Sequence, residues 1–226
     1  MKVVALIPFW SNYQSSPNVL SSIPLVDLGG KSLISRTVEL INQVALIDEV
    51  VIFASDDQIK QHVDDKVQYT FLKRNQSLDS DKASIEDIIE SFLLLHDADI
   101  VVIVHPKSPF LKSTTIEECV HKVFISKFDS AFTASSIRKY VWFKGETLNY
   151  SLSHDTPVIS KIDPVLIETS SVYVFTRDLF NNKRRRIGKN PFVKVIGHFE
   201  GFEIEREDDF KMAELIINAG LDRERS

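Results

Sequence analysis

The sequence predicts an α/β fold built on a doubly wound, mostly parallel sheet with a small inserted segment. Short runs rich in β-branched residues recur along the first half, and each is apolar enough to be buried on both faces. Segments with apolar residues at three- and four-residue spacings separate these runs, as in amphipathic helices. Strands that alternate with helices favour a parallel sheet, because each helix carries the chain back to the start of the next strand.

The elements of the first half follow in a regular order. The predicted strands are Lys2–Pro8, Asp48–Ser55, Val67–Leu72 and Asp99–His105. The predicted helices are Ser32–Ala45 and Ser84–His96, and the second begins with the Ser-Ile-Glu-Asp pattern of a capping box. Sheets of this kind bind ligands beyond the carboxyl ends of their strands. The loops after Pro8, Ser55, Leu72 and His105 are therefore the places to search for a site.

The second half is less regular. Strands are predicted at Asp129–Ser135 and Ser170–Thr176, one or two more within Val193–Glu205, and a closing helix at Glu207–Ala219. The mixed polarity of Tyr140–Asp163 fits either an insertion or a subunit-contact segment. We therefore expect one domain over residues 1–226, with a possible insertion or dimerisation segment at about 137–168.

Composition narrows the class of protein. With 226 residues and 43% hydrophobic content, the chain suits one domain with a sizeable core. A net charge of -5 argues against nucleic acid as the main partner. The lone cysteine, Cys119, fits packing within a helix in a reducing compartment. The sequence has no apolar run near the roughly 20 residues of a membrane span, so we expect a cytoplasmic protein.

Five segments resemble the cytidylyltransferases that activate sialic acid and related nonulosonic acids. In order and spacing they are Asp27–Asp57, Lys73–Ile89, Ile103–Leu111, Arg186–Phe192 and Phe202–Glu214. The resemblance implies a Rossmann-like fold of the nucleotide-diphospho-sugar transferase type and a homodimer. It also implies that an acidic sugar attacks the α-phosphate of CTP, giving a CMP-sugar for surface-glycan biosynthesis and pyrophosphate.

An acidic pair precedes the last predicted helix. The resembled family carries two aspartates in this strand, and Glu203 and Glu205 stand at the matching positions. An i, i+2 spacing on a strand places both carboxylates on one face, as a hard cation such as Mg²⁺ requires. The resemblance implies that this pair holds Mg²⁺, and the alternative is an ordinary solvated strand face.

The loop after the fourth predicted strand is expected to face the sugar. His105 stands where family members commonly have glutamine, and Lys107 and Ser108 follow in the same loop. His105 would donate a hydrogen bond to the sugar or accept a proton near neutral pH, and Lys107 would meet a carboxylate. The alternative for His105 is a strand-end histidine hydrogen-bonded to the backbone.

Nucleotide contacts are implied at the loop after the third predicted strand. Arg74 matches a family arginine that contacts the nucleotide, and Asp81 and Ser84 stand in their family places. The planar guanidinium of arginine suits a phosphate or a base edge. We therefore predict that Arg74 is a catalytic residue as well as a nucleotide contact. The alternative is a surface ion pair with Asp79 or Asp81. The basic run Lys183–Arg186 is interpreted as a solvated loop rather than a polyphosphate site.

The loop after the first predicted strand departs from the family. Active members carry an arginine and a lysine there, whereas Leu6–Asn18 contains no lysine, arginine or glycine, and the next basic residue is Lys31. Ser11 and Asn12 can still hydrogen-bond a nucleotide, but they cannot neutralise its phosphates. We therefore expect weaker CTP binding than in typical relatives.

Two functions stay open at this stage. The first is a divergent cytidylyltransferase that uses CTP and an acidic sugar. The second is a catalytically weak or inactive relative that binds a sugar or nucleotide, or acts as a partner in a glycan pathway. Nucleotidyl transfer to another kind of substrate is a further, less favoured alternative.

Overall fold

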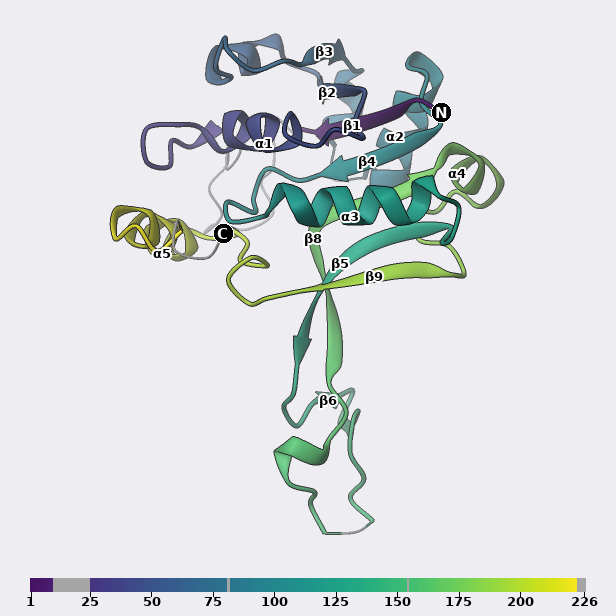
Figure 1. Ribbon diagram of the computed structural model, residues 1–226, viewed down its shortest axis with the longest axis vertical. Coiled ribbons are helices and arrows are strands. Elements are labelled where there is room, and N and C mark those ends of the chain that lie inside the picture. The colour runs from purple at the N-terminus through teal and green to yellow at the C-terminus, as the bar shows by residue number, and fades with distance from the viewer. Residues whose placement is uncertain (10–24, 81, 154, 223–226) are drawn as a thin grey trace.

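The computed structural model describes residues 1–9, 25–80, 82–153 and 155–222 (Figure 1). The strands are β1 Val3–Pro8, β2 Glu49–Ala54, β3 Thr70–Lys73, β4 Ile100–Val104, β5 Ser130–Ile137, β6 Trp142–Phe143, β7 Glu146–Thr147, β8 Val165–Thr176 and β9 Pro191–Ile196. The α-helices are α1 Leu33–Ile41, α2 Ile85–Leu95, α3 Ser113–Phe124, α4 Arg177–Lys183 and α5 Glu207–Asn218. Short 3₁₀ helices span Asp57–His62 (η2), Gln76–Asp79 (η3) and Ile159–Lys161 (η4).

Within the described residues, seven strands form one sheet in the order β3-β2-β1-β4-β8-β5-β9. Neighbouring strands are parallel except at β8, which pairs antiparallel with both β4 and β5. The predicted fold class, a mostly parallel sheet with flanking helices, is confirmed. The antiparallel direction of β8 matters for the site, because it places the middle of β8, where Val172 pairs with Val104, beside the end of β4.

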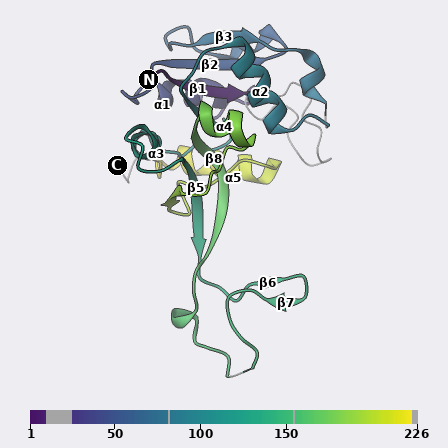
Figure 2. The ribbon, with the colours of Figure 1, turned by 90° about the vertical axis from the view of Figure 1, so that its right-hand side faces the viewer.

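Helices cover both faces of the sheet, as two perpendicular views show (Figures 1 and 2). α1 and α3 pack on one face, where Cys119 is fully buried as predicted. α2 packs on the other face through Ile88, Ile89 and Phe92, and α4 joins it there through Phe180. The capping box predicted for α2 is present, with the Ser84 and Asp87 side chains each bonding to the other's backbone N–H. α5 packs on a third cluster that includes Leu28 and Phe110.

Several predicted elements differ in extent, and β8 begins at Val165 rather than Ser170. β3 begins at Thr70 rather than Val67, and α1 ends at Ile41 rather than Ala45. More important for the site, the one or two strands predicted within Val193–Glu205 are a single strand, β9, that stops at Ile196. A turn follows, in which the Gly201 N–H bonds to the Gly197 carbonyl at 2.9 Å.

Aromatic packing explains why the chain turns there. The rings of Phe199 and Phe202 lie 4.4 and 5.7 Å from the ring of Phe110. Because burying these rings is worth more than continuing an edge strand, the chain leaves the sheet. Glu203 and Glu205 therefore lie on an extended loop, and the prediction that they lie on a strand is wrong.

An arm projects from the body of the molecule. β5 and β8 continue past the rest of the sheet as a two-stranded ribbon, with Ile137 paired to Val165 (Figures 1 and 2). The segment between them carries the β6–β7 hairpin, whose turn residues Lys144 and Gly145 both have positive φ, as in a type I′ turn. The insertion predicted at about 137–168 lies in this arm. None of the described helices combines the length and the apolar character that a membrane crossing requires.

Candidate active site

Three chain segments meet where β4 ends. The loop after β4 holds His105, Lys107 and Ser108, and the His105 N–H donates to the Ser171 carbonyl on β8 at 3.3 Å. Ser108 Oγ donates to Ser171 Oγ at 2.9 Å. On its other side, the Lys107 carbonyl accepts from the Ile204 N–H at 2.8 Å. Backbone hydrogen bonds thus fix the predicted substrate loop between β8 and the segment before α5.

His105 is held in its neutral form. Burial, together with the positive charges of Lys107 and Arg186, lowers the pKa of His105 from 6.5 to about 3. An imidazole with this pKa is uncharged at neutral pH and is a weak base. Of the two roles predicted for His105, hydrogen bonding fits this environment better than proton acceptance.

Arg186 also acts on His105, although in the sequence it stood out only as the end of the basic run and the first residue of a resembling segment. Its guanidinium carbon is 4.1 Å from the centroid of the Tyr173 ring. The Tyr173 hydroxyl donates to Glu168 Oε2 at 3.1 Å, and burial raises the pKa of this tyrosine to about 12. The interpretation of Lys183–Arg186 as a solvated loop is therefore wrong for Arg186, which packs on β8.

The segment that follows Arg186 explains how it is held. The Asp129 carboxylate accepts from the N–H groups of Lys189 and Asn190 at 2.8 and 2.9 Å. The Gly188 N–H donates to Ser130 Oγ at 2.9 Å. A Cβ on Gly188 would collide with the Asp129 carboxylate. Glycine is required here because the loop wraps closely around Asp129, and this wrapping fixes the segment next to Arg186.

Lys107 lies between the two predicted metal ligands. Its Nζ is 3.0 Å from Glu205 Oε1 and 3.5 Å from Glu203 Oε2. Glu203 also accepts from the Ser170 N–H at 2.8 Å. Burial raises the pKa of Glu203, although Lys107 and the Ser170 N–H favour its charged form.

The residues present do not fit a resident Mg²⁺ in this arrangement. The two carboxylates converge on one point, as predicted, but an ammonium group lies at that point. Across the described ranges, no group of three or more His, Cys, Asp or Glu side chains is placed to hold a metal ion. A magnesium ion takes about six oxygen ligands and can be held by two carboxylates when water and phosphate supply the rest, so the ammonium is the group that does not fit. Magnesium binding by Glu203 and Glu205 stays a prediction.

Two of the predicted nucleotide contacts, Arg74 and Ser84, lie in the described residues, directly after β3 and directly before α2. Arg74 is only 3% exposed and forms an ion pair with Asp79, whose carboxylate also accepts from Ser55 Oγ. The alternative of an ion pair with Asp79 is thus realised, but in the interior rather than at the surface. Ser84 caps α2. Asp81, Ser11 and Asn12 lie outside the described residues, and contact with a nucleotide stays a prediction for all five predicted nucleotide-binding positions.

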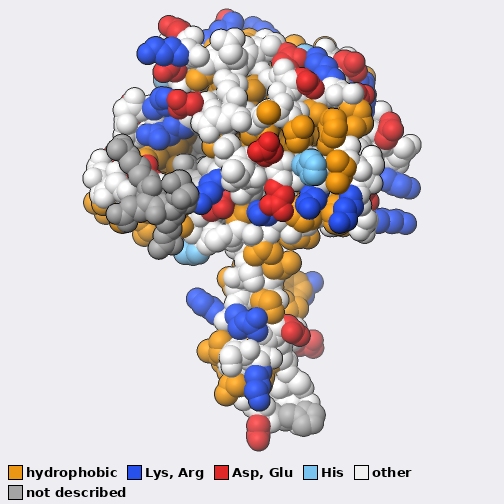
Figure 3. All heavy atoms as spheres, in the orientation of Figure 1, with side chains coloured by type: hydrophobic (Ala, Val, Ile, Leu, Met, Phe, Trp, Pro, Cys, Tyr) orange, Lys and Arg blue, Asp and Glu red, His pale blue; other side chains and the backbone are white. Residues whose placement is uncertain are grey.

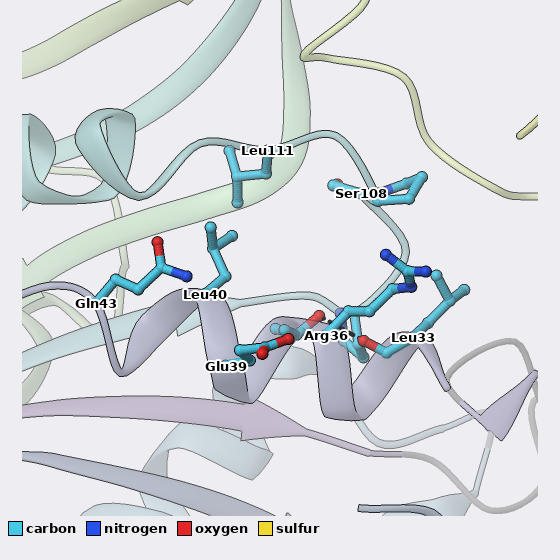
Figure 4. Close-up of a pocket in the computed structure, with 10 residues that line it drawn as sticks. Leu33, Arg36, Glu39, Leu40, Gln43, Ser108 and Leu111 are labelled. Carbon is cyan, nitrogen blue, oxygen red and sulfur yellow. Dashed lines mark hydrogen bonds between the residues drawn. The ribbon is translucent and has the colours of Figure 1, made fainter. Parts of the chain in front are cut away.

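A pocket of about 180 Å³ lies between α1 and the loop after β4 (Figure 4). Arg36 and Glu39 line it from α1, Gln43 lines it from the turn after α1, and Ser108 and Leu111 line it from the loop. Arg36 Nε donates to the Leu28 carbonyl at 2.9 Å, so this guanidinium supports the turn before α1. Of the predicted site residues in the described part of the chain, Ser108 alone lines the pocket, and we do not assign the pocket to the site.

A family model described as Cytidylyltransferase matches residues 21–181. The chain belongs to the cytidylyltransferase family. The matched region runs from the segment before α1 into α4, so it includes β4 and the loop of His105, Lys107 and Ser108.

Curated relatives carry more specific names. The 3-deoxy-manno-octulosonate cytidylyltransferase of Chlamydia caviae is 27% identical over 172 residues, which are 70% of this chain and 66% of that protein. The match thus covers slightly less than two thirds of that relative's length. The post-translational flagellin modification protein B of Campylobacter coli is 21% identical over 219 residues, which are 84% of this chain and 91% of that protein.

Solved structures share the fold over nearly the whole chain. A CMP:2-keto-3-deoxy-manno-octonic acid synthetase complexed with CTP superposes with a TM-score of 0.71 at 17% identity, covering 97% of this chain and all of that one. A 4-diphosphocytidyl-2C-methyl-D-erythritol synthase from Anaerococcus prevotii superposes with a TM-score of 0.65 at 15% identity, covering 96% of this chain and 98% of that one. At these identities the likeness supports the fold alone.

Proposed function

We propose that this cytidylyltransferase transfers CMP from CTP to an acidic sugar and releases pyrophosphate. The observation that carries the proposal is the cluster at the carboxyl end of β4. Here Arg186 and a neutral His105 lie together, and Lys107 sits beside them. Family membership and a CTP-complexed structural neighbour support the nucleotide half of the reaction. Relatives named for a keto sugar acid support the acidic-sugar half.

The chemistry requires positioning and charge neutralisation. The anomeric oxygen of the sugar forms a bond to the α-phosphorus, the bond from that phosphorus to the bridging oxygen breaks, and pyrophosphate leaves. The hydroxyl proton passes to solvent or to the phosphates. In this proposal the Arg186 guanidinium attracts the sugar carboxylate, and an imidazole N–H of His105 donates to a sugar hydroxyl. Tyr173 forms an apolar wall beneath Arg186.

We further propose that the sugar is a nonulosonic acid or a related acidic sugar used in surface-glycan synthesis. The five resembling segments and the flagellin-modification relative support this choice. The relatives named for 3-deoxy-manno-octulosonate make that eight-carbon sugar acid the first alternative substrate. All candidate substrates share a carboxylate next to the anomeric carbon, which is the group that Arg186 would recognise.

The test is pyrophosphate release from CTP with a panel of sugars. The panel contains sialic acid, a bacterial nonulosonic acid, 3-deoxy-manno-octulosonate and, as a control, a neutral hexose. We expect release with at least one acidic sugar and none with the hexose. Release should fall at least about tenfold in Arg186→Met, because a charged contact to the sugar is lost. An Arg185→Met variant serves as the matched control, since Arg185 is exposed in the same basic run.

The alternative is a weak or inactive family member that only binds its ligands. The absence of lysine and arginine between Phe9 and Gly30 favours it, because the two basic residues with which family members would neutralise the phosphates are missing. Saturable binding of CTP or sugar without pyrophosphate release from any panel member would support this alternative. No binding of either ligand would contradict both functions.

We also propose a homodimer that acts in the cytoplasm, where CTP is made. Large apolar side chains are exposed on the arm, among them Trp142 at 55% and Phe143 at 60% (Figure 3). Apolar surface concentrated on a projecting segment is typical of an interface. The single buried cysteine agrees with a reducing compartment.

A further inference from the structure

The ion cluster of Lys107, Glu203 and Glu205 is built into the fold rather than formed by chance at the surface. The lysine lies on the loop after β4, and the two glutamates lie on the segment before α5, 98 residues further along the chain for the Lys107–Glu205 pair. The Lys107 carbonyl accepts from the N–H of Ile204, the residue between the two glutamates, at 2.8 Å. This backbone bond fixes the distance between the two segments.

Both glutamates are anchored independently of the lysine. Glu203 Oε1 accepts from the Ser170 N–H on β8 at 2.8 Å. The backbone N–H of Glu205 donates to Asp209 Oδ2 at 3.0 Å, as part of the cap of α5. Only 17% of the Glu203 side chain and 25% of the Lys107 side chain are exposed. The ammonium therefore meets a Glu203 carboxylate that the Ser170 N–H also holds, and a Glu205 carboxylate whose backbone is fixed by the α5 cap.

The charges explain what the lysine does there. Two carboxylates that converge on one point repel each other, and a positive charge between them offsets this repulsion. Lys107 supplies one such charge from within the chain. A divalent cation at the same point would have to displace the ammonium or bind against its repulsion. With two carboxylates from the protein, water or a substrate phosphate would have to supply its other oxygen ligands.

We propose that Lys107 is the resident cation of the Glu203–Glu205 pair and takes the place that a divalent metal ion would occupy. The pair then holds no metal in the free protein, and the lysine orients both carboxylates at the edge of the site. This inference rests on the proposed function only for its meaning in catalysis, because the cluster and its affinity for metal ions exist without CTP.

The test measures metal binding in the absence of nucleotide. Binding of Mn²⁺ is followed by electron paramagnetic resonance of the free ion, and Mg²⁺ binding by calorimetry. We expect no saturable binding by the unmodified protein below about 1 mM, a typical affinity limit for weak extracellular cation sites. Lys107→Met should gain at least about tenfold in affinity, because it frees the carboxylates while keeping a side chain of similar length.

Two control variants show where any gain in affinity arises. Lys107→Met combined with Glu203→Gln and Glu205→Gln should lose the gained affinity. Lys211→Met should gain nothing, although Lys211 also lies between two acids, with Nζ 2.9 Å from Glu207 and 3.8 Å from Asp208. Circular dichroism confirms folding of each variant, and Lys107→Gln replaces Lys107→Met if the latter does not fold.

Equal Mn²⁺ affinity in the unmodified protein and in Lys107→Met would overturn the proposal, as would a gain that survives the loss of both glutamates. Either result is independent of pyrophosphate release. Failure of this inference therefore leaves the proposed function standing, and the absence of turnover leaves this inference standing.

Discussion

The imidazole of His105 is kept neutral by its surroundings. It lies next to Lys107 and Arg186 and is largely withdrawn from water, which lowers its pKa to about 3. In the unfolded chain a histidine has a pKa near 6.5. Between these two values the unfolded chain binds a proton that the folded chain excludes, so the free energy of unfolding falls as pH falls below about 6.5.

Replacing His105 with glutamine should remove this acid sensitivity. Glutamine keeps an N–H donor and does not titrate. From pH 7 to pH 5, the unmodified protein should lose about 1–2 kcal/mol more unfolding free energy than His105→Gln. Urea unfolding followed by circular dichroism at several pH values measures the difference. His62→Gln, at an exposed histidine, is the control. Parallel pH profiles for the unmodified protein and His105→Gln would contradict the prediction.

Arg74 and Asp79 form a buried ion pair, and the pair should serve stability. Removing one partner of such a pair leaves a charge in the interior without its counterion. Asp79→Ala should therefore cost about 3–5 kcal/mol of unfolding free energy, whereas replacing both residues by apolar ones of similar size should cost much less. Chemical unfolding of Asp79→Ala and of the double variant Arg74→Met, Asp79→Leu measures both effects.

The same variants decide the role of Arg74. If Arg74 serves only the fold, the double variant should bind CTP as the unmodified protein does, in a calorimetric titration. A loss of CTP affinity of about tenfold or more in a folded double variant would instead favour the predicted nucleotide contact.

At the scale of elements, the loop from Ile187 to Asn190 holds Arg186 in place over Tyr173 of β8. Four bonds tie this loop to the start of β5: two reach the Asp129 carboxylate, one reaches Ser130 Oγ, and one runs from the Asp129 N–H to the Asn190 carbonyl. The loop approaches so closely that a side chain at Gly188 has no room. This loop, which belongs to one of the five resembling segments, thus positions Arg186 through its backbone bonds.

Gly188→Ala should destabilise the protein and displace Arg186. Forcing a methyl group against the Asp129 carboxylate should cost about 1–3 kcal/mol, measured by thermal or chemical unfolding. Gly197→Ala is the matched control, because a Cβ at Gly197 meets no atom within 4 Å. If Gly188→Ala were as stable as the control, the close approach of this loop to Asp129 would be refuted.

At the scale of the whole molecule, the arm carries its apolar side chains into solvent in a single chain (Figure 3). The arm is held internally, since Tyr140 Oη donates to the Pro157 carbonyl at 2.6 Å and Asn149 Nδ2 donates to the Lys139 and Asp163 carbonyls at 2.9 Å. An ordered segment with exposed aromatic rings is suited to pack against a second copy.

The proposed dimer should depend on the arm. Trp142→Glu combined with Phe143→Glu should weaken association by at least about 30-fold, because aromatic residues at interfaces contribute about 2 kcal/mol or more each. Sedimentation velocity over a range of protein concentrations measures the change. Leu94→Glu, at an exposed leucine on α2, is the control and should leave association unchanged. A monomer at all concentrations in the unmodified protein would contradict the dimer itself.

Much of the architecture could be predicted from local sequence. The β-branched runs gave β1, β2 and β4 close to their observed bounds, and the capping box placed the start of α2 correctly. Both signals depend on residues within a few positions of one another, and side-chain periodicity and capping act over that range. The same local reasoning failed at Val193–Glu205, because packing of Phe199 and Phe202 on the distant Phe110 ended the strand.

By itself, the sequence determined the α/β class, most helices and strands, and the absence of basic residues between Phe9 and Gly30. The tertiary structure decided which charged groups meet. The antiparallel direction of β8 placed Tyr173 under Arg186, and the bond from Ile204 to Lys107 set the ammonium between Glu203 and Glu205. These contacts join residues that are far apart in the chain, so strand order and register fix them, and local periodicity carries no information about either.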